Sequence, residues 1–90
     1  MNTAARPEGM TFPCEFALKA MGVAEPGFDA LVVEIVQRHG PRVREGAVSS
    51  RSSKNGKYVS VTVSFQADSR EQLDAIYDAL TAHEKVLMRL

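Results

Sequence analysis

Ninety residues, 44% of them hydrophobic, are enough for one domain with a modest packed core and too apolar for a disordered chain. The formal net charge of zero argues against a generally basic surface for nucleic acid, and the one cysteine, Cys14, cannot form an internal disulfide or hold a metal alone. No stretch reaches the roughly 20 continuous apolar residues of a membrane span, so we expect a cytoplasmic protein with no membrane-embedded part.

The first eleven residues are expected to form an arm that precedes the domain. They are mostly polar or small, with Pro7 and Gly9 among them, which predicts a flexible segment. Residues 1–9 lack the apolar core of a secretory signal, which also favours a cytoplasmic location. We therefore expect a flexible arm over residues 1–11 and a single domain over residues 12–90.

An alternating apolar and polar pattern over residues 12–21 predicts the first strand, which Gly22 would end. A helix follows, because apolar residues then recur at helical spacing until Gly40-Pro41 stops them. The apolar face of the strand comprises Phe12, Cys14, Phe16, Leu18 and Ala20, and the apolar stripe of the helix comprises Phe28, Leu31, Val32, Ile35 and Val36.

A weak edge strand within residues 42–52 and a strong strand over residues 58–67 come next. The Asn55-Gly56 pair between them predicts a hairpin with a type I′ turn, because both central residues of that turn need positive φ. The apolar face of the stronger strand comprises Val59, Val61, Val63, Phe65 and Ala67.

Ser69 with Gln72 three residues later predicts a capping box at the start of a second helix. The helix is expected to fray near His83. Its apolar stripe comprises Leu73, Ile76, Tyr77 and Leu80, and alternation of Val86, Met88 and Leu90 on one face predicts a short final strand.

The element order of strand, helix, strand, strand, helix, strand predicts an α+β fold. With short, right-handed connections it becomes a ferredoxin-like βαββαβ sandwich, a four-stranded antiparallel sheet with two helices on one face. The other face would be left to solvent or to a partner, and it would carry Glu15, Ala17, Lys19, Tyr58, Ser60, Thr62, Ser64, Leu87 and Arg89. Such a mixed face suits association between protomers or a small ligand held between them, as in ACT-type regulatory domains.

No set of residues in the sequence suggests catalysis, and we expect no enzyme, no metal and no cofactor. Cys14 shares the core side of its strand, which favours an inert buried thiol. His39 and His83 each lie at a predicted helix end, where a histidine usually interacts with the helix dipole. The sequence contains neither a Cys-x-x-Cys pair nor a glycine-rich phosphate loop.

The charge is unevenly distributed along the chain. Residues 38–57 carry a net charge of +5, and the rest of the chain carries −5. The positive segment has three possible roles: protection of an edge strand, contact with an anion or nucleic acid, or contact with a protein partner. Nucleic acid is the least expected of these partners, because the strong strand directs only Tyr58 outward for base stacking.

Five segments of the chain resemble the YbeD-like family of small bacterial proteins. They are FPCEF (12–16), KAMG (19–22), VVEIVQRH (32–39), SSK (52–54) and NGKYVSV (55–61). The resemblance spans residues 12–90 and implies a ferredoxin-like, ACT-resembling fold in a bacterial protein. It implies no catalytic residues, because the family has no assigned activity.

The candidate site residues are polar residues of the matching segments that core packing does not require. They are Arg38, His39, Lys54 and Tyr58, which we predict to contribute to an anionic-ligand or partner patch. For function, we expect a non-enzymatic regulatory or protein-interaction domain that forms a homo-oligomer or binds a bacterial protein. The alternatives are an ACT-type small-molecule sensor and a weak anion or nucleic-acid binder that uses a basic edge.

Overall fold

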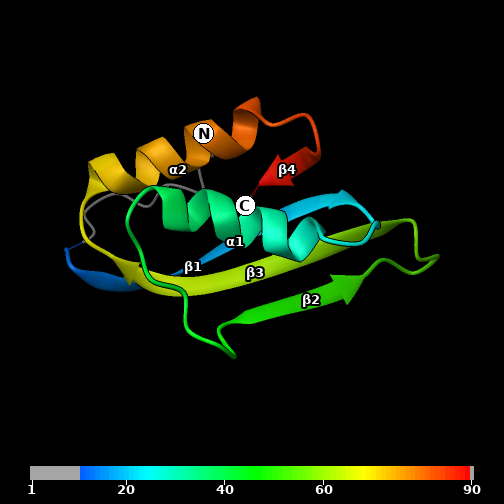
Figure 1. Ribbon diagram of the computed structural model, residues 1–90, viewed down its shortest axis with the longest axis horizontal. Coiled ribbons are helices and arrows are strands. Elements are labelled where there is room, and N and C mark those ends of the chain that lie inside the picture. The colour runs from blue at the N-terminus through cyan, green and yellow to red at the C-terminus, as the bar shows by residue number, and fades with distance from the viewer. Residues whose placement is uncertain (1–10, 90) are drawn as a thin grey trace.

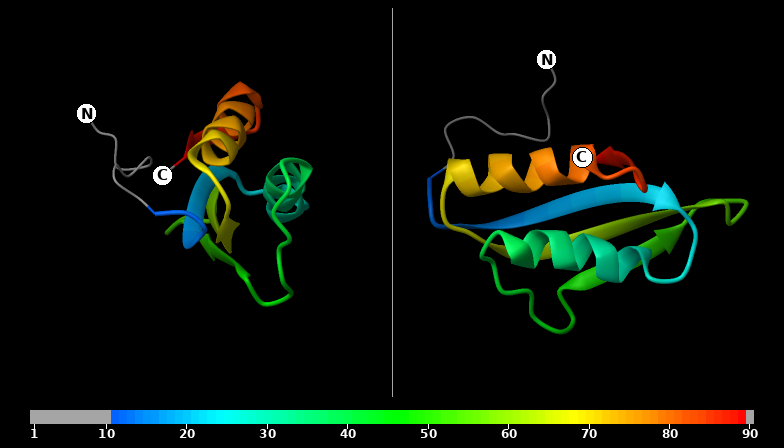
Figure 2. Two further views of the ribbon diagram at one scale, coloured as in Figure 1. Left: turned by 90° about the vertical axis from the view of Figure 1, so that its left-hand side faces the viewer. Right: turned by 45° about the horizontal axis from the view of Figure 1, so that its top comes forward.

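The computed structural model describes residues 11–89, in which six elements follow the predicted order (Figure 1). They are β1 (Cys14–Val23), α1 (Phe28–Arg38), β2 (Val48–Ser52), β3 (Tyr58–Ala67), α2 (Arg70–Ala82) and β4 (Val86–Arg89). The strands form an antiparallel sheet in the order β2-β3-β1-β4. Both helices cover one face of it (Figure 2), which confirms the ferredoxin-like sandwich. Apart from Thr11, the predicted arm lies outside the described residues, as does Leu90.

The core lies between the sheet and the two helices and contains the predicted apolar stripes. The buried residues are Leu18, Ala20, Val61, Val63, Phe65 and Ala67 of the sheet, Phe28, Val32, Ile35 and Val36 of α1, and Leu73, Ile76, Tyr77 and Leu80 of α2. Leu31 is only half-buried. Neither of these two helices is long and apolar enough to cross a membrane.

β1 continues through Gly22, so the prediction that this glycine ends the strand was wrong. Gly22 lies opposite Val59 of β3, on the side of the sheet that faces the helices. A Cβ added there would lie 2.5 Å from Cε1 of Phe28 and 2.6 Å from the carbonyl oxygen of Lys85. Glycine is required here because the ring of Phe28 rests directly on the strand backbone.

β4 pairs with β1 through an irregular register. Met88 lies opposite Met21, but Val86 lies opposite Gly22, so one extra residue of β4 is accommodated between the two pairs. Val86 therefore packs against the core while Met88 lies on the open face. The predicted alternation, which placed both residues on one face, was wrong because it assumed an uninterrupted strand.

The β2–β3 connection forms the predicted hairpin but not the predicted type I′ turn. Gly56 has a φ of 74°, whereas no non-glycine residue within 11–89 has a positive φ, so Asn55 lacks the required conformation. Ser53 closes the loop instead, since its N–H donates to the carbonyl of Tyr58 (2.8 Å) and its Oγ accepts from the N–H of Tyr58 (2.9 Å). Asn55 Oδ1 accepts from the N–H of Lys57 (3.2 Å).

Gln72 connects the start of α2 to the end of α1. Its N–H donates to Ser69 Oγ (3.1 Å), as the capping box predicts. Its side chain departs from that motif, because Oε1 accepts from the N–H of Asp68 (2.8 Å) rather than from that of Ser69. Nε2 donates to the carbonyl of His39 (3.2 Å), the residue that caps α1. One side chain thus satisfies backbone groups at both helix ends.

Candidate functional site

The four candidate residues from the sequence belong to the C-terminal end of α1 and to the β2–β3 hairpin, and the hairpin lies toward the other end of α1 (Figure 1). Arg38 and His39 lie at its C-terminal end, beside the start of α2. Lys54 and Tyr58 lie in and beside the β2–β3 hairpin, where Tyr58 pairs with Val23 at the far end of β1. An eleven-residue helix is about 15 Å long, so the structure does not bring the four residues into one patch.

Three of these residues make local contacts. Arg38 forms an ion pair with Glu34 one helical turn earlier (2.9 Å), and the Nδ1–H of His39 donates to the carbonyl of Ile35 (2.9 Å). The ammonium of Lys57 lies 5.6 Å from the centre of the Tyr58 ring. Lys54 is exposed in the loop.

Cys14 and His83, the other two reactive side chains in the sequence, also contact neighbouring parts of the fold. Cys14 packs against the core and pairs with Ala67 of β3, and Nδ1 of His83 accepts from the N–H of Lys85 (3.2 Å). Over residues 11–89, no three His, Cys, Asp or Glu side chains are grouped closely enough to hold a metal ion.

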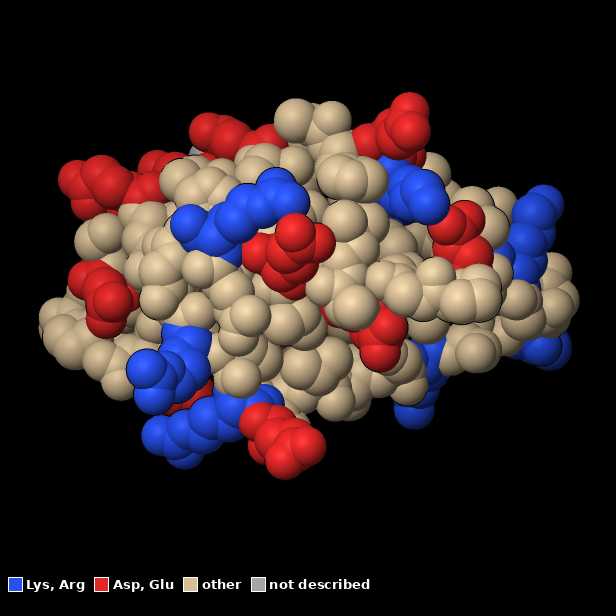
Figure 3. Space-filling view, viewed as in Figure 1, with Lys and Arg blue, Asp and Glu red and all other residues tan. Residues whose placement is uncertain are grey.

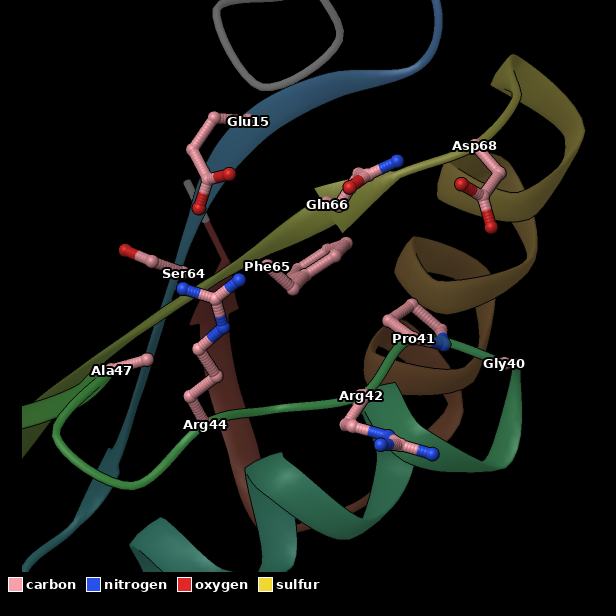
Figure 4. Close-up of a pocket in the computed structure, with 10 residues that line it drawn as sticks. All are labelled: Glu15, Gly40, Pro41, Arg42, Arg44, Ala47, Ser64, Phe65, Gln66 and Asp68. Atoms are coloured by element: carbon pink, nitrogen blue, oxygen red, sulfur yellow. The ribbon is translucent and has the colours of Figure 1, made fainter.

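A groove of about 410 Å³, here called the arginine groove, lies between the loop that joins α1 to β2 and the C-terminal half of β3 (Figure 4). The groove is lined by Gly40, Pro41, Arg42, Arg44 and Ala47 of the loop, by Ser64, Phe65 and Gln66 of β3, and by Glu15 and Asp68. The guanidinium of Arg44 extends from the loop toward Ser64 (Figure 4). Neither Arg42 nor Arg44 forms an ion pair with another residue of the described chain.

The arginine groove does not follow from the sequence alone. Arg42 and Arg44 belong to the positive segment, but their spacing alone does not place them beside β3. The loop is held there by the bond from the N–H of Ser64 to the carbonyl of Ala47 (3.0 Å), which extends the β2–β3 ladder to the residue before the start of β2.

An apolar corner, formed by Met21, Val23, Leu87 and Met88, occupies the place where β1 and β4 meet. Val23, Leu87 and Met88 are 45%, 54% and 51% exposed, and Met21 lies opposite Met88. β4 is an edge strand, and no other described strand pairs with its outer side. Large apolar side chains therefore coincide with a free sheet edge.

One ion pair lies beside the apolar corner. Lys85 Nζ donates to Glu25 Oε1 (2.7 Å), which joins the start of β4 to the loop between β1 and α1. This hydrogen bond to Glu25, together with the charge of its carboxylate, raises the pKa of Lys85 above its ordinary value. Both side chains are about half exposed, so the ion pair adds little to the free energy of unfolding. Its main effect is to hold the β1–α1 loop next to the start of β4.

The charges are separated across the molecule as well as along the chain. In Figure 3, acidic side chains gather along the upper side, where α2 lies in Figure 1, and basic side chains predominate along the lower side and at the hairpin end. The acids of α2 are Glu71, Asp74 and Asp78, and the bases of the β2 side include Arg42, Arg44, Arg51, Lys54 and Lys57.

Residues 7–90 match a protein family described as "Protein of unknown function (DUF493)". The chain belongs to the DUF493 family. A UPF0250 protein of Neisseria gonorrhoeae is 44% identical over 75 residues, which cover 83% of this chain and 82% of the relative. Another, from Nitrosomonas europaea, is 43% identical over 79 residues, which cover 88% and 91%. The predicted membership of a family of small bacterial proteins is confirmed.

Two solved structures support the fold of this DUF493 protein. The solution structure of protein HP0495 from H. pylori superposes with a TM-score of 0.73 at 16% identity, covering 100% of this chain and 94% of that one. The ACT domain from the GTP pyrophosphokinase of Chlorobium tepidum superposes with a TM-score of 0.62 at 12% identity, covering 84% and 96%. The ACT-like resemblance of the fold is thereby confirmed.

Proposed function

We propose that this DUF493 chain is a non-enzymatic regulatory or protein-interaction domain of the bacterial cytoplasm that pairs with a second copy through its apolar corner. The observation that carries the proposal is the coincidence of three roughly half-exposed apolar side chains with the free edge of β4. Free edges pair readily with other strands, and most soluble proteins protect them with charge. Three of the four residues of β4 are apolar, so the strand itself carries little of that protection.

Pairing of two β4 strands would bury apolar surface from both protomers at once. Complete burial of a Leu or Met side chain is worth about 1.5–3 kcal/mol relative to full exposure, so covering the exposed half of each contributes on the order of 1 kcal/mol. A twofold arrangement uses every such contact twice. Several contacts of this size, with added backbone hydrogen bonds, are a reasonable basis for a dimer.

The absence of an enzymatic role is also a proposal, and it is supported by what the reactive side chains do. Cys14 packs against the core, while His39 and His83 both bond to nearby backbone groups. A nucleophile needs a base within hydrogen-bond reach, and these three side chains belong to different parts of the fold.

The test is the solution mass of the intact protein, measured by light scattering at two concentrations. We expect a dimer for the wild-type chain and a monomer for Leu87→Glu, because a carboxylate in the corner would have to be desolvated for pairing. The matched control is Val33→Glu, which places the same charge on a half-buried position of α1 and should leave the dimer intact. A wild-type monomer at both concentrations would contradict the proposal, as would a dimer that survives Leu87→Glu.

A second candidate function, an ACT-type small-molecule sensor, is supported by the arginine groove. Its two arginines and two acids could hold the charges of a small acid or amino acid. A thermal-shift screen of such compounds tests it, since a ligand at ~100 times its Kd stabilises the fold by about 2.7 kcal/mol. We expect Arg44→Ala to abolish any shift. A screen without shifts would count against this candidate and leave the dimer proposal unaffected.

A further inference from the structure

The outer edge of β2 presents a regular row of unpaired backbone groups. At the ends of the β2–β3 ladder, the N–H of Ser64 donates to the carbonyl of Ala47 (3.0 Å) and the N–H of Ser53 donates to the carbonyl of Tyr58 (2.8 Å). Alternate residues of a strand direct these groups to the same edge, so Ser49 and Arg51 also bond to β3. Val48, Ser50 and Ser52 must then direct their N–H and C=O groups outward.

A groove follows this edge on the side of the helices. One part of it, about 520 Å³, lies between Val48 of β2 and residues of α1 that include Ala30 and Val33. A second part, about 410 Å³, lies between Ser50 and Ser52 of β2 and the start of α1. The two parts share Asp29, and together they are here called the helix–strand groove.

The side chains of an added strand would enter this groove at every second position. Val48, Ser50 and Ser52 lie opposite Val63, Val61 and Val59, whose side chains face the helices. Directly opposed residues of neighbouring strands point to the same face of a sheet. A strand that bonds to these three outward residues of β2 would therefore place its alternate side chains beside Val33 and Val48.

We propose that the helix–strand groove binds an extended peptide, which adds to the sheet as a fifth strand beside β2. Extended segments are commonly recognised in this way, with main-chain hydrogen bonds for affinity and side-chain pockets for specificity. Its groove-facing residues would be apolar where they meet Ala30, Val33 and Val48. The same part of the groove is also lined by Asp29, Glu34, Gln37 and Arg38. This site is distinct from the apolar corner, since β2 and β4 are opposite edges of the sheet.

The peptide residues that alternate with the groove-facing ones would point to the open face of the sheet, where the charge of β2 selects them. Arg51 lies opposite Ser60 on the open face, and Lys54 follows β2 in the hairpin. Neither side chain forms an ion pair with another residue of the described chain. Peptide residues that point to the open face would lie beside these cations, so acidic residues are favoured there. The partner we infer is an extended segment in which acidic and apolar residues alternate.

The same cations disfavour a second copy of this chain as the occupant. Pairing β2 with its own copy would bring Arg51 and Lys54 of both protomers to one seam, where like charges repel. On this proposal the positive segment serves two of the three roles that the sequence left open: it protects the edge against self-pairing, and it binds a protein partner that is acidic.

The probe for the test is a fluorescent, terminally blocked peptide of eight residues in which glutamate alternates with valine. Its control has the same composition, with the four glutamates before the four valines. We expect saturable anisotropy binding of the alternating peptide and at least tenfold weaker binding of the control, because only the alternating order matches both faces of an added strand.

Ser50→Pro and Ser50→Ala form a matched pair of variants. Proline removes the outward N–H of Ser50 and leaves the ladder to β3 intact, whereas alanine keeps that N–H. We expect Ser50→Pro to weaken binding of the alternating peptide at least tenfold and Ser50→Ala to leave it unchanged. Val33→Glu should weaken binding similarly, because it places a carboxylate on the groove floor.

Hydrogen exchange of the Ser50 amide is a further readout that needs no variant. We expect the bound peptide to slow this exchange, because the Ser50 N–H would bond to the added strand. The proposal is overturned if the alternating peptide does not bind, if the control binds equally, or if the Ser50 amide exchanges at the same rate with the peptide present. Binding that is unchanged in both Ser50→Pro and Val33→Glu would also overturn it. Leu87→Glu should not alter peptide binding. The solution mass therefore tests the dimer and the anisotropy tests the peptide site, and either proposal can fail without the other.

Discussion

Gln72 illustrates how much of a residue's role its local sequence can reveal. Its spacing from Ser69 predicts the cap at the start of α2, and the bond to Ser69 Oγ confirms it. The bond to the carbonyl of His39 spans 33 residues and could not be predicted, because it depends on how closely the two helices pack. Local hydrogen bonds follow from spacing, whereas this one follows from the tertiary fold.

Gln72→Ala should destabilise the protein by about 1–2 kcal/mol, since it removes both side-chain hydrogen bonds. Gln72→Glu retains an acceptor for the N–H of Asp68 and adds a favourable charge to the first turn of α2, so its cost should be below about 1 kcal/mol. Urea unfolding of the three proteins measures both differences. Equal losses for the two variants would show that the bond to His39, rather than the cap, provides the stability.

The sequence and the structure agree on the elements and differ where one element contacts another. The periodicity of β3 and of both helices predicts their buried faces, because period two and period 3.6 are properties of the isolated segments. Gly22 looked like a strand end because the ring of Phe28, which needs the space, comes from another element. The candidate patch was split for a similar reason, since Arg38 and Lys54 are separated by the length of α1.

The hairpin shows the same limit and provides a prediction at the scale of an element. Asn55-Gly56 indicated a type I′ turn, but Ser53 Oγ accepts from the N–H of Tyr58 and Asn55 does not adopt the positive φ that this turn needs. Ser53→Ala should destabilise the protein by about 1–2 kcal/mol, because it removes this bond and the bond to Asn55 Oδ1. Ser52→Ala is the control and should change the stability by less than about 0.5 kcal/mol. Thermal unfolding of the two variants measures both changes. Equal stability of Ser53→Ala and Ser52→Ala would contradict the role given to Ser53.

At the scale of the whole molecule, the two edges of the sheet, β2 and β4, differ in charge and in exposed apolar surface. The β2 side is basic and borders the helix–strand groove, whereas β4 is short and borders the apolar corner. The sequence predicts the charge separation, because residues 38–57 carry +5. It does not predict that the exposed apolar residues gather at the opposite edge, since Val23 and Leu87 are 64 positions apart.

This arrangement predicts how salt affects association. A dimer held by the apolar corner should change its dissociation constant by less than about threefold between about 50 and 500 mM NaCl, because salt mainly screens charges. Sedimentation equilibrium measures this change. A nucleic-acid complex through the basic side would instead weaken steeply over the same range as bound counterions are displaced. A dimer with that steep dependence would point to an interface formed by charges rather than by Leu87 and Met88.

The contact between Gly22 and Phe28 also provides a spectroscopic reporter. The α-protons of Gly22 lie next to an aromatic ring, so the ring current should move their NMR signals away from the usual glycine range. Phe28 is the first residue of α1 and lines the helix–strand groove, whereas Gly22 lies in β1, next to the pairing with β4. A single glycine resonance, with no label attached, is therefore sensitive to movement of α1 against the sheet from either edge.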